Sequence, residues 1–202
     1  MARLVGQIDL CKNEAILDAA MAVMSERGMA ASMDEIARRA GVSKQTVYNH
    51  YGSKTELVRA LAARRAHEVT APLDTAESLD QPVETLTAFA RVLLTAVLNP
   101  AGVSFYRMAV ANAHALPDIG RAMFEAGALT SRRRLAAYLA QETAAGRLAC
   151  PDPMRAAEFF AGGVIGSAQT AMLLGVETRH APEEIDQSAR EAAERFVRAY
   201  AA

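Results

Sequence analysis

The sequence predicts an all-α fold of about nine helices with no β-sheet. Three observations support this. Ala, Leu, Arg and Glu dominate the 202 residues, and these residue types favour helix. Apolar residues recur at helical spacing, and no segment alternates with the period of two that a half-buried strand shows. Capping residues, glycine stops and first-turn prolines divide the chain at short intervals.

Glycines and capping boxes delimit the first helices. The first helix is expected over about residues 10–27, where one stripe is apolar, and Gly28 ends it. Ser32 and Glu35 then form a capping box, in which the side chain of each residue bonds the backbone of the other. This box opens a second helix, which ends at Gly41.

A very short third helix is expected over about residues 44–50, with Ser43 as its N-cap. A second capping box, from Ser53 to Glu56, opens a fourth helix that fades before Pro72. A helix as short as the third is marginal by itself in water. We therefore expect the neighbouring helices to hold it in place for a purpose.

The rest of the chain continues the helical pattern after a polar connection over residues 70–81. Asn99-Pro100 ends one helix, and Asp152-Pro153 is an N-cap followed by a first-turn proline. Helices are expected over about residues 81–98, 103–113, 117–146, 153–175 and 182–200.

Composition excludes several classes of protein. No apolar stretch approaches the eighteen residues of a membrane span, and the N-terminal residues lack the apolar core of a secretory signal. Cys11 and Cys150 are too few and too far apart for a disulfide framework or a metal cluster, and the four histidines lack ligand spacing. We expect a cytoplasmic protein with no cofactor, no metal and no membrane partner.

Charge is distributed unevenly along the chain. The net charge is −1, which by itself argues against a nucleic-acid partner. Residues 1–65, however, carry ten Lys or Arg against seven Asp or Glu, while residues 66–202 carry twelve against sixteen. A basic N-terminal part beside an acidic remainder is weak evidence alone, but it agrees with nucleic-acid binding by the N-terminal helices.

The outward face of the short third helix is polar. With Val47 taken as the inward residue, a rotation of about 100° per residue places hydrogen-bonding side chains on the opposite side. These are Gln45, Thr46, Tyr48 and Asn49, with Lys44 and His50 at the edges of that face. Asn and Gln can bind adenine in the DNA major groove, and Thr and Tyr can contact phosphate or a thymine methyl.

Each of these residues, taken singly, is more often part of a solvated surface. The joint pattern of a short capped helix between two glycine stops favours insertion into the major groove. Ser32 and Lys54 stand at the starts of the neighbouring helices, where unpaired backbone N–H groups attract phosphate, so both are candidate contacts to the DNA backbone.

Residues 15–61 closely resemble the tetracycline-repressor (TetR) family of bacterial transcription regulators. The resemblance is carried by ILDAAMAVMSERG and SMDEIARRAGVSKQTVYNHYGSKTELV. It implies a three-helix helix-turn-helix DNA-binding domain over residues 1–53 and a larger helical effector-binding and dimerisation domain over residues 54–202. The DNA-binding residues it implies, together with the residue types, are Ser32, Ser43, Lys44, Gln45, Thr46, Tyr48, Asn49, His50 and Lys54.

The later helices are less informative. LPDIGRAMFEAG and the stretch from GRLAC to GGVIG are similar to the C-terminal domain of AefR-like members of that family. Two of these helices carry apolar or small residues that would suit a symmetric four-helix dimer interface, or else pack within one subunit. The candidate interface residues are Ala157, Ala161, Val164, Ile165, Ala168, Ile185, Ala189, Phe196, Val197 and Tyr200.

A ligand pocket is also expected in the larger domain. Nine methionines favour an adaptable apolar cavity and hence a hydrophobic or amphipathic effector. Its candidate lining is Phe89, Leu93, Phe105, Tyr106, Met108, Asn112, His114, Met123, Phe124, Phe160, Gln169 and Met172. The basic run Arg132–Arg134 is interpreted as surface ion pairs, because its three side chains point in different directions on a helix.

The leading hypothesis is a homodimeric repressor that a small-molecule effector releases from palindromic operator DNA. A helix-turn-helix unit usually needs two half-sites, about 34–36 Å apart, which favours a dimer. One alternative is a helical carrier or enzyme that resembles a regulator, although no nucleophile–base motif is present and an enzyme is not expected. Another is an activator, or an architectural DNA binder, without an effector.

Overall fold

The structure is a computed structural model that describes residues 5–75, 80–176 and 181–202. Its regular elements are helices, as the sequence predicts, and within those ranges the one β-type contact is an isolated antiparallel bridge between Leu148 and Ala201. The chain forms two compact units, and each is built from two separate segments. The first unit comprises Met1–Ala63 and Pro100–Ala126, and the second comprises Arg64–Asn99 and Gly127–Ala202.

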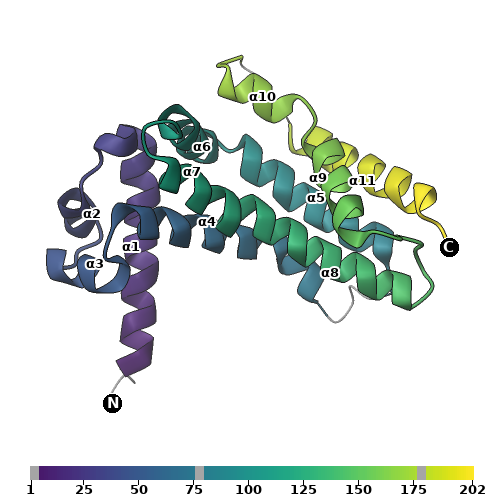
Figure 1. Ribbon diagram of the computed structural model, residues 1–202, viewed down its shortest axis with the longest axis horizontal. Coiled ribbons are helices and arrows are strands. Elements are labelled where there is room, and N and C mark those ends of the chain that lie inside the picture. The colour runs from purple at the N-terminus through teal and green to yellow at the C-terminus, as the bar shows by residue number, and fades with distance from the viewer. Residues whose placement is uncertain (1–4, 76–79, 177–180) are drawn as a thin grey trace. The chain divides into compact units, whose positions relative to one another are not determined.

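The first unit contains α1 to α3, the start of α4, and two later helices (Figure 1). Its elements are α1 (Val5–Arg27), η1 (Gly28–Ala30), α2 (Met33–Arg39), α3 (Lys44–Tyr51), α4 (Lys54–Thr70, as far as Ala63), α6 (Pro100–Asn112) and α7 (Pro117–Met123). Ile16, Ile36, Val47 and Leu61 are completely buried in its core. Phe105 of α6 belongs to the same core, which is therefore not made by the N-terminal segment alone.

Local side-chain chemistry sets the boundaries of α2, α3 and α4. Ser32 accepts from the backbone N–H of Glu35 at 3.2 Å, and Glu35 accepts in return from the N–H of Ser32 at 3.0 Å. Ser43 and Ser53 each accept from the backbone N–H three residues further on, at 3.0 and 3.2 Å. Gly52 follows α3 with φ of 65°, a conformation that disfavours any residue with a Cβ. These helix starts lie where the sequence predicts them.

The second unit is built on α5, α8, α9 and α11 (Figure 1). Its elements are the end of α4 from Arg64, η2 (Ala71–Asp74), α5 (Pro82–Leu98), α8 (Thr130–Ala144), α9 (Pro153–Ile165), α10 (Ala168–Leu173) and α11 (Pro182–Ala199). α11 packs along α5 and α8 packs along α9. A chain of aromatic rings joins Phe89, Phe160, Phe196 and Tyr200, with centroid separations of 6.1, 5.0 and 4.6 Å.

An ion pair closes the turn after α8. Glu142 is completely buried, and its two carboxylate oxygens accept from Nε and Nη2 of Arg147 at 2.7 and 2.9 Å. The hydrogen bond to Glu142 raises the pKa of Arg147. Beyond this turn, the backbone N–H of Ala149 donates to the carbonyl of Tyr200 at 2.7 Å and attaches the end of α11.

Two helices that the sequence predicts as continuous are each interrupted. The helix expected over residues 117–146 is divided into α7 and α8 by a π-helical turn, η4 (Phe124–Leu129). The helix expected over residues 153–175 stops at Ile165, because Gly166 takes φ of 51°, and α10 then forms separately. Both expectations were wrong. Apolar residues continue at helical spacing through each interruption, so their spacing does not reveal a local change of helical geometry.

Within the described ranges, no single helix is long and apolar enough to cross a membrane. α5 and α6 reach the required length and hydropathy only when they are taken together.

Candidate nucleic-acid interface

α3 is held to its neighbours at both ends. Ser43 caps its first turn, and Val47 is fully buried in the core of the first unit. At the other end, the hydroxyl of Tyr51 donates to the side-chain oxygen of Asn13 on α1. These contacts explain how a helix of eight residues persists, because tertiary packing supplies what its length does not.

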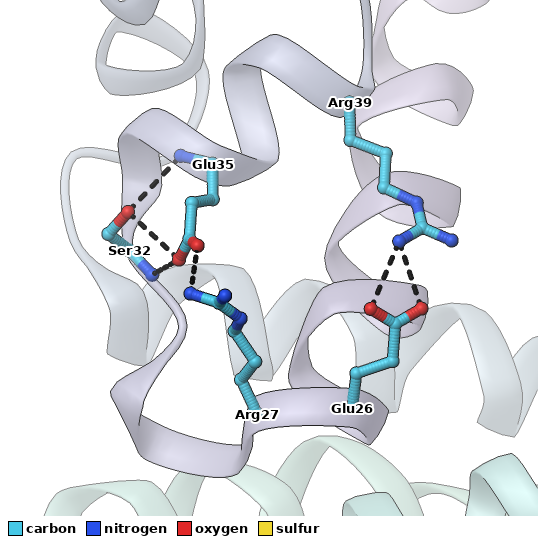
Figure 2. A network of polar contacts seen from close by, with 5 residues as sticks. All are labelled: Glu26, Arg27, Ser32, Glu35 and Arg39. Atoms are coloured by element: carbon cyan, nitrogen blue, oxygen red, sulfur yellow. Dashed lines mark hydrogen bonds and ion pairs between the residues drawn. The ribbon is translucent and has the colours of Figure 1, made fainter.

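Ion pairs brace α2 against the end of α1 (Figure 2). Nη1 of Arg39 lies 2.9 and 3.1 Å from the two carboxylate oxygens of Glu26, and Arg27 pairs with Glu35. The backbone N–H of Ser32 is the main cause that lowers the pKa of Glu35, and the positive charge of Arg27 adds to it. The capping box and the ion pairs together fix the orientation of α2, on which α3 packs.

Three side chains of α3 present hydrogen-bonding groups to solvent. Gln45, Tyr48 and Asn49 are exposed, and Tyr48 retains 40% of its possible accessible area. Nε2 of Gln45 donates to Oδ1 of Asn49 at 2.7 Å, so the two amides form a pair along one turn of the helix. These residues lie on the side of α3 opposite Val47, as the periodicity predicts.

The two lysines near α3 are already engaged within the protein. Lys44 pairs with Asp34 of α2 at 2.9 Å, and this contact raises the pKa of the lysine. Its ammonium group also lies 5.8 Å from the centre of the Tyr48 ring. Lys54 donates to the backbone carbonyl of Met29 at 2.8 Å and so ties the start of α4 to η1. Sequence reasoning missed both contacts, because each partner lies at least ten residues away.

The remaining predicted DNA contacts lie around the same helix. The hydroxyls of Ser43 and Thr46 are 2.8 Å apart, and the hydroxyl of Ser32 lies 3.2 Å from the Glu35 carboxylate. His50 is half-buried, with its ring centre 6.0 Å from that of Tyr51. The structure thus brings all nine predicted residues to α3 and the two helix starts beside it, while their contacts with DNA stay a prediction.

The residues predicted to line a ligand pocket are distributed over both units. In the first unit, Phe105, Met108 and Met123 are buried in the core, and Asn112 donates to the carbonyl of Met108 at 2.8 Å. The exposed residues there are Tyr106, His114 and Phe124. In the second unit Phe89, Leu93 and Phe160 are buried, and Gln169 and Met172 are half-buried. The expected pocket stays a prediction.

Most residues predicted for a dimer interface pack inside their own subunit. The buried ones are Ala157, Ala161, Val164, Ala189 and Phe196, and the half-buried ones are Ile165, Ala168, Ile185, Val197 and Tyr200. Except for Ala168, all of them contribute to or pack against the core of the second unit. The sequence allowed these side chains either to form a dimer interface or to pack within one subunit. In the structure most of them pack within the subunit.

α9 and α11 nevertheless share an open groove of about 590 Å³. Phe159, which is 65% exposed, lines it together with Glu191 and Arg195. Val164, Phe196 and Tyr200 from the predicted interface also line this groove. Phe159 could not be predicted from the apolar spacing, because it stands one residue before Phe160 and outside the buried stripe.

Known protein families match most of the chain. Residues 16–61 match the family described as bacterial regulatory proteins, tetR family, and residues 84–202 match the AefR-like transcriptional repressor C-terminal domain. The transcriptional repressor LfrR of Mycolicibacterium smegmatis is 42% identical over 71 residues. That match covers 35% of this chain and 36% of LfrR, so the chain spans little more than a third of this curated relative.

Solved structures match over nearly the whole length. A crystal structure of a TetR-family transcriptional regulator from Mesorhizobium loti has a TM-score of 0.77 and 27% identity, and the match covers 96% of this chain and 98% of that one. The flavonoid-responsive regulator FrrA has a TM-score of 0.69 and 31% identity, with coverage of 94% and 97%.

Proposed function

The chain belongs to the tetR family of bacterial regulatory proteins, and from this we propose that it is a dimeric, operator-binding repressor that a small molecule releases from DNA. Each dimer would place two copies of α3 in successive major grooves of a palindromic site, with half-sites about 34–36 Å apart. The description of the matched C-terminal family as a transcriptional repressor supports repression over activation.

The exposed face of α3 carries this proposal. Gln45, Tyr48 and Asn49 offer amide and hydroxyl groups that are complementary to base edges in the major groove. α1 holds α3 through Asn13, α2 holds it through the Lys44–Asp34 pair, and Val47 is buried in the core. The buried face of α3 is anchored to the core and its exposed face is polar. Such a helix loses little conformational entropy when it enters a groove of DNA.

The surrounding residues suit contacts with the DNA backbone. We assign phosphate contacts to Ser32, Ser43, Thr46 and His50, together with the two lysines described above. An ammonium group has three N–H donors, so Lys44 and Lys54 can each keep the partner seen here and still bind a phosphate oxygen. Such contacts fix the register of α3 on DNA without reading its sequence.

The groove between α9 and α11 supports the dimer. In a two-fold interface each surface meets its own copy, so the exposed ring of Phe159 from one subunit would enter the groove of the other. Glu191 and Arg195 lie on the same groove and form an ion pair with each other, which a two-fold interface would bring next to its own copy. This arrangement uses the exposed side of the two helices and leaves their buried stripe in the core.

α4 provides a route from effector to DNA. Its residues up to Ala63 belong to the first unit and its residues from Arg64 belong to the second, so one continuous helix enters both. An effector that binds one arrangement of α4 more tightly changes the operator affinity by the same coupling free energy, typically about 1–3 kcal/mol. The response of FrrA to flavonoids supports a small aromatic or amphipathic effector.

Operator binding by substituted proteins tests the proposal. The purified protein is used to select DNA from fragments of a bacterial genome, and the affinity for the selected site is then measured at several salt concentrations. We expect Tyr48→Ala and Asn49→Ala each to lower specific affinity by about 1–3 kcal/mol. The logarithm of affinity should fall with the logarithm of salt concentration, with a slope of about −0.9 per phosphate contacted.

Arg133→Met is a matched control, because Arg133 is exposed on α8 in the second unit. It should leave the affinity for the selected site unchanged. The proposal fails if the protein selects no DNA at low salt, which would favour a carrier. It also fails if both α3 variants keep full sequence-specific affinity.

A further inference from the structure

Asp34 of α2 carries a negative charge on the candidate DNA-binding surface. Its two carboxylate oxygens both lie 2.9 Å from Nζ of Lys44, at the edge of the polar face of α3. We propose that Asp34 limits the affinity of the protein for DNA of any sequence, because it neutralises Lys44 and repels the phosphate that this lysine would bind. This inference rests on the proposed operator binding and concerns the electrostatic part of that binding.

The ion pair lies on the surface of the first unit. The side chains of Asp34 and Lys44 retain 59% and 60% of their accessible area, so an approaching phosphate can reach both. Exposed pairs of this kind contribute little to the stability of the fold, because water screens their attraction. Asp34 also stands two residues after Ser32, a candidate phosphate contact at the start of the same helix. A charge here therefore acts on a bound phosphate more than on folding.

The shape of the ammonium group sets the distance between the two anions. The three N–H groups of Lys44 diverge, so one can donate to Asp34 while another donates to a phosphate oxygen. With tetrahedral directions, that phosphate oxygen would lie about 4–5 Å from the nearest carboxylate oxygen. Two unit negative charges at this separation in water repel each other by an energy that corresponds to an affinity about fivefold lower.

Two arginines beside α2 show the same pattern of charge compensation. Arg39 pairs with Glu26, and Arg27 pairs with Glu35. Attraction between cationic side chains and phosphate is the part of DNA binding that does not depend on base sequence. Carboxylates that compensate these cations reduce that part. Recognition then depends more strongly on the hydrogen-bonding groups that α3 presents to the bases.

DNA binding by Asp34→Asn tests the inference. Fluorescence anisotropy measures the affinity for a random-sequence duplex and for the selected genomic site at several salt concentrations. We expect Asp34→Asn to bind both duplexes about fivefold more tightly at low salt. The slope of log affinity against log salt should steepen by up to about 0.9, the value for one full phosphate contact. In a Lys44→Met background the same substitution should have almost no effect, because no phosphate is then held beside Asp34.

Asp118→Asn is a matched control. Asp118 is the second residue of α7, as Asp34 is of α2, and it pairs with Arg121 at 3.4 Å on the surface. Both substitutions therefore remove one negative charge, one exposed ion pair and one favourable interaction with a helix dipole. α7 lies away from α3 (Figure 1), so Asp118→Asn should leave both affinities nearly unchanged. Thermal unfolding confirms that each variant is folded.

The outcomes distinguish failure of the inference from failure of the proposed function. If the natural protein binds neither duplex at low salt, the proposed function falls and the inference falls with it. If it binds DNA but Asp34→Asn behaves like Asp118→Asn, or keeps its effect in the Lys44→Met background, only the inference is overturned. Weaker binding of Asp34→Asn to the selected site also overturns it, because the carboxylate would then accept a hydrogen bond from a base.

Discussion

Arg134 of α8 donates from Nη1 to Oγ1 of Thr70, the last residue of α4, over 3.0 Å. Thr70 is completely buried, and its hydroxyl proton is directed to the carbonyl of Ala66 at 2.8 Å, which leaves its oxygen to accept from the guanidinium group. The same Nη1 lies 3.2 Å from Nδ1 of His67 and 3.4 Å from Oδ2 of Asp74. Arg134 therefore ties the end of α4 and η2 to α8.

Removal of this contact should destabilise the protein modestly. Arg134→Met keeps most of the apolar stem and deletes the hydrogen bonds, so we expect a loss of about 1 kcal/mol in the free energy of unfolding, measured by urea denaturation. Arg133→Met, on the adjacent exposed residue, should change it by less than about 0.5 kcal/mol. Equal effects of the two substitutions would show that Arg134 has no special structural role.

Acidification should weaken the start of α2 through Glu35. Its pKa is lowered in the folded protein, chiefly by the backbone N–H of Ser32, so the ionised form stabilises the fold above the ordinary pKa of 4.5. That stability is lost as the pH falls from 4.5 through the lower folded value. Glu35→Gln cannot ionise, so it should melt below the natural protein at neutral pH and the two should converge in acid. Thermal unfolding at a series of pH values checks this, and a constant difference would contradict it.

Tyr138 should resist ionisation in alkali. Burial raises the pKa of this phenol to about 12 from its ordinary value of 10.0, while a hydrogen bond with Thr85 acts in the opposite direction. The un-ionised folded form is therefore favoured, and this contribution to stability is lost as the pH rises from 10 through about 12.

Tyr138→Phe checks this assignment by ultraviolet absorbance titration. We expect the difference between the natural protein and the variant to show one phenol that titrates near pH 12 in the folded state. The variant should also lose less stability than the natural protein over the same alkaline range. A difference spectrum that develops near pH 10 would place the ring in solvent and refute the assignment.

The two cysteines should differ in reactivity. Cys11 is exposed, whereas Cys150 is buried and burial raises the pKa of its thiol. Because the thiolate is the reactive form, iodoacetamide at neutral pH should alkylate Cys11 and leave Cys150 unmodified until denaturant is added. Mass spectrometry of proteolytic peptides measures both sites, and Cys11→Ser should prevent labelling of the folded protein. Equal labelling of both thiols would contradict the buried position of Cys150.

Local chemistry made the N-terminal helices predictable. The capping box at Ser32, the N-cap bond at Ser53 and the glycine at position 52 act within four residues, so their outcome can be inferred from the sequence alone. The polar face of α3 could be predicted for the same reason, since one buried residue, Val47, fixes the rotation of a short helix.

Long-range packing was not predictable in this way. The apolar stripes of α9 and α11 were correctly identified, but spacing alone does not reveal whether a stripe faces its own subunit or a second copy. Ala157 and Ala189 proved to be core residues, while Phe159, outside the stripe, lines the groove. Arg134 does form the surface ion pair that the sequence predicts, with Asp74 at 3.4 Å. Its hydrogen bond to the buried Thr70 could not be predicted, because this partner stands about sixty residues earlier in the chain.

The divided core of the first unit also bears on the order of events during synthesis. A nascent chain that has reached Ala63 already contains α3, but Phe105, Met108 and Met123, which are buried in the same core, have not yet been translated. Until α6 has left the ribosome, the apolar side of α1 lacks a helix that packs on it. A truncated product ending at Ala63 should therefore be a target for chaperones and proteases, and not a small competitor for the operator.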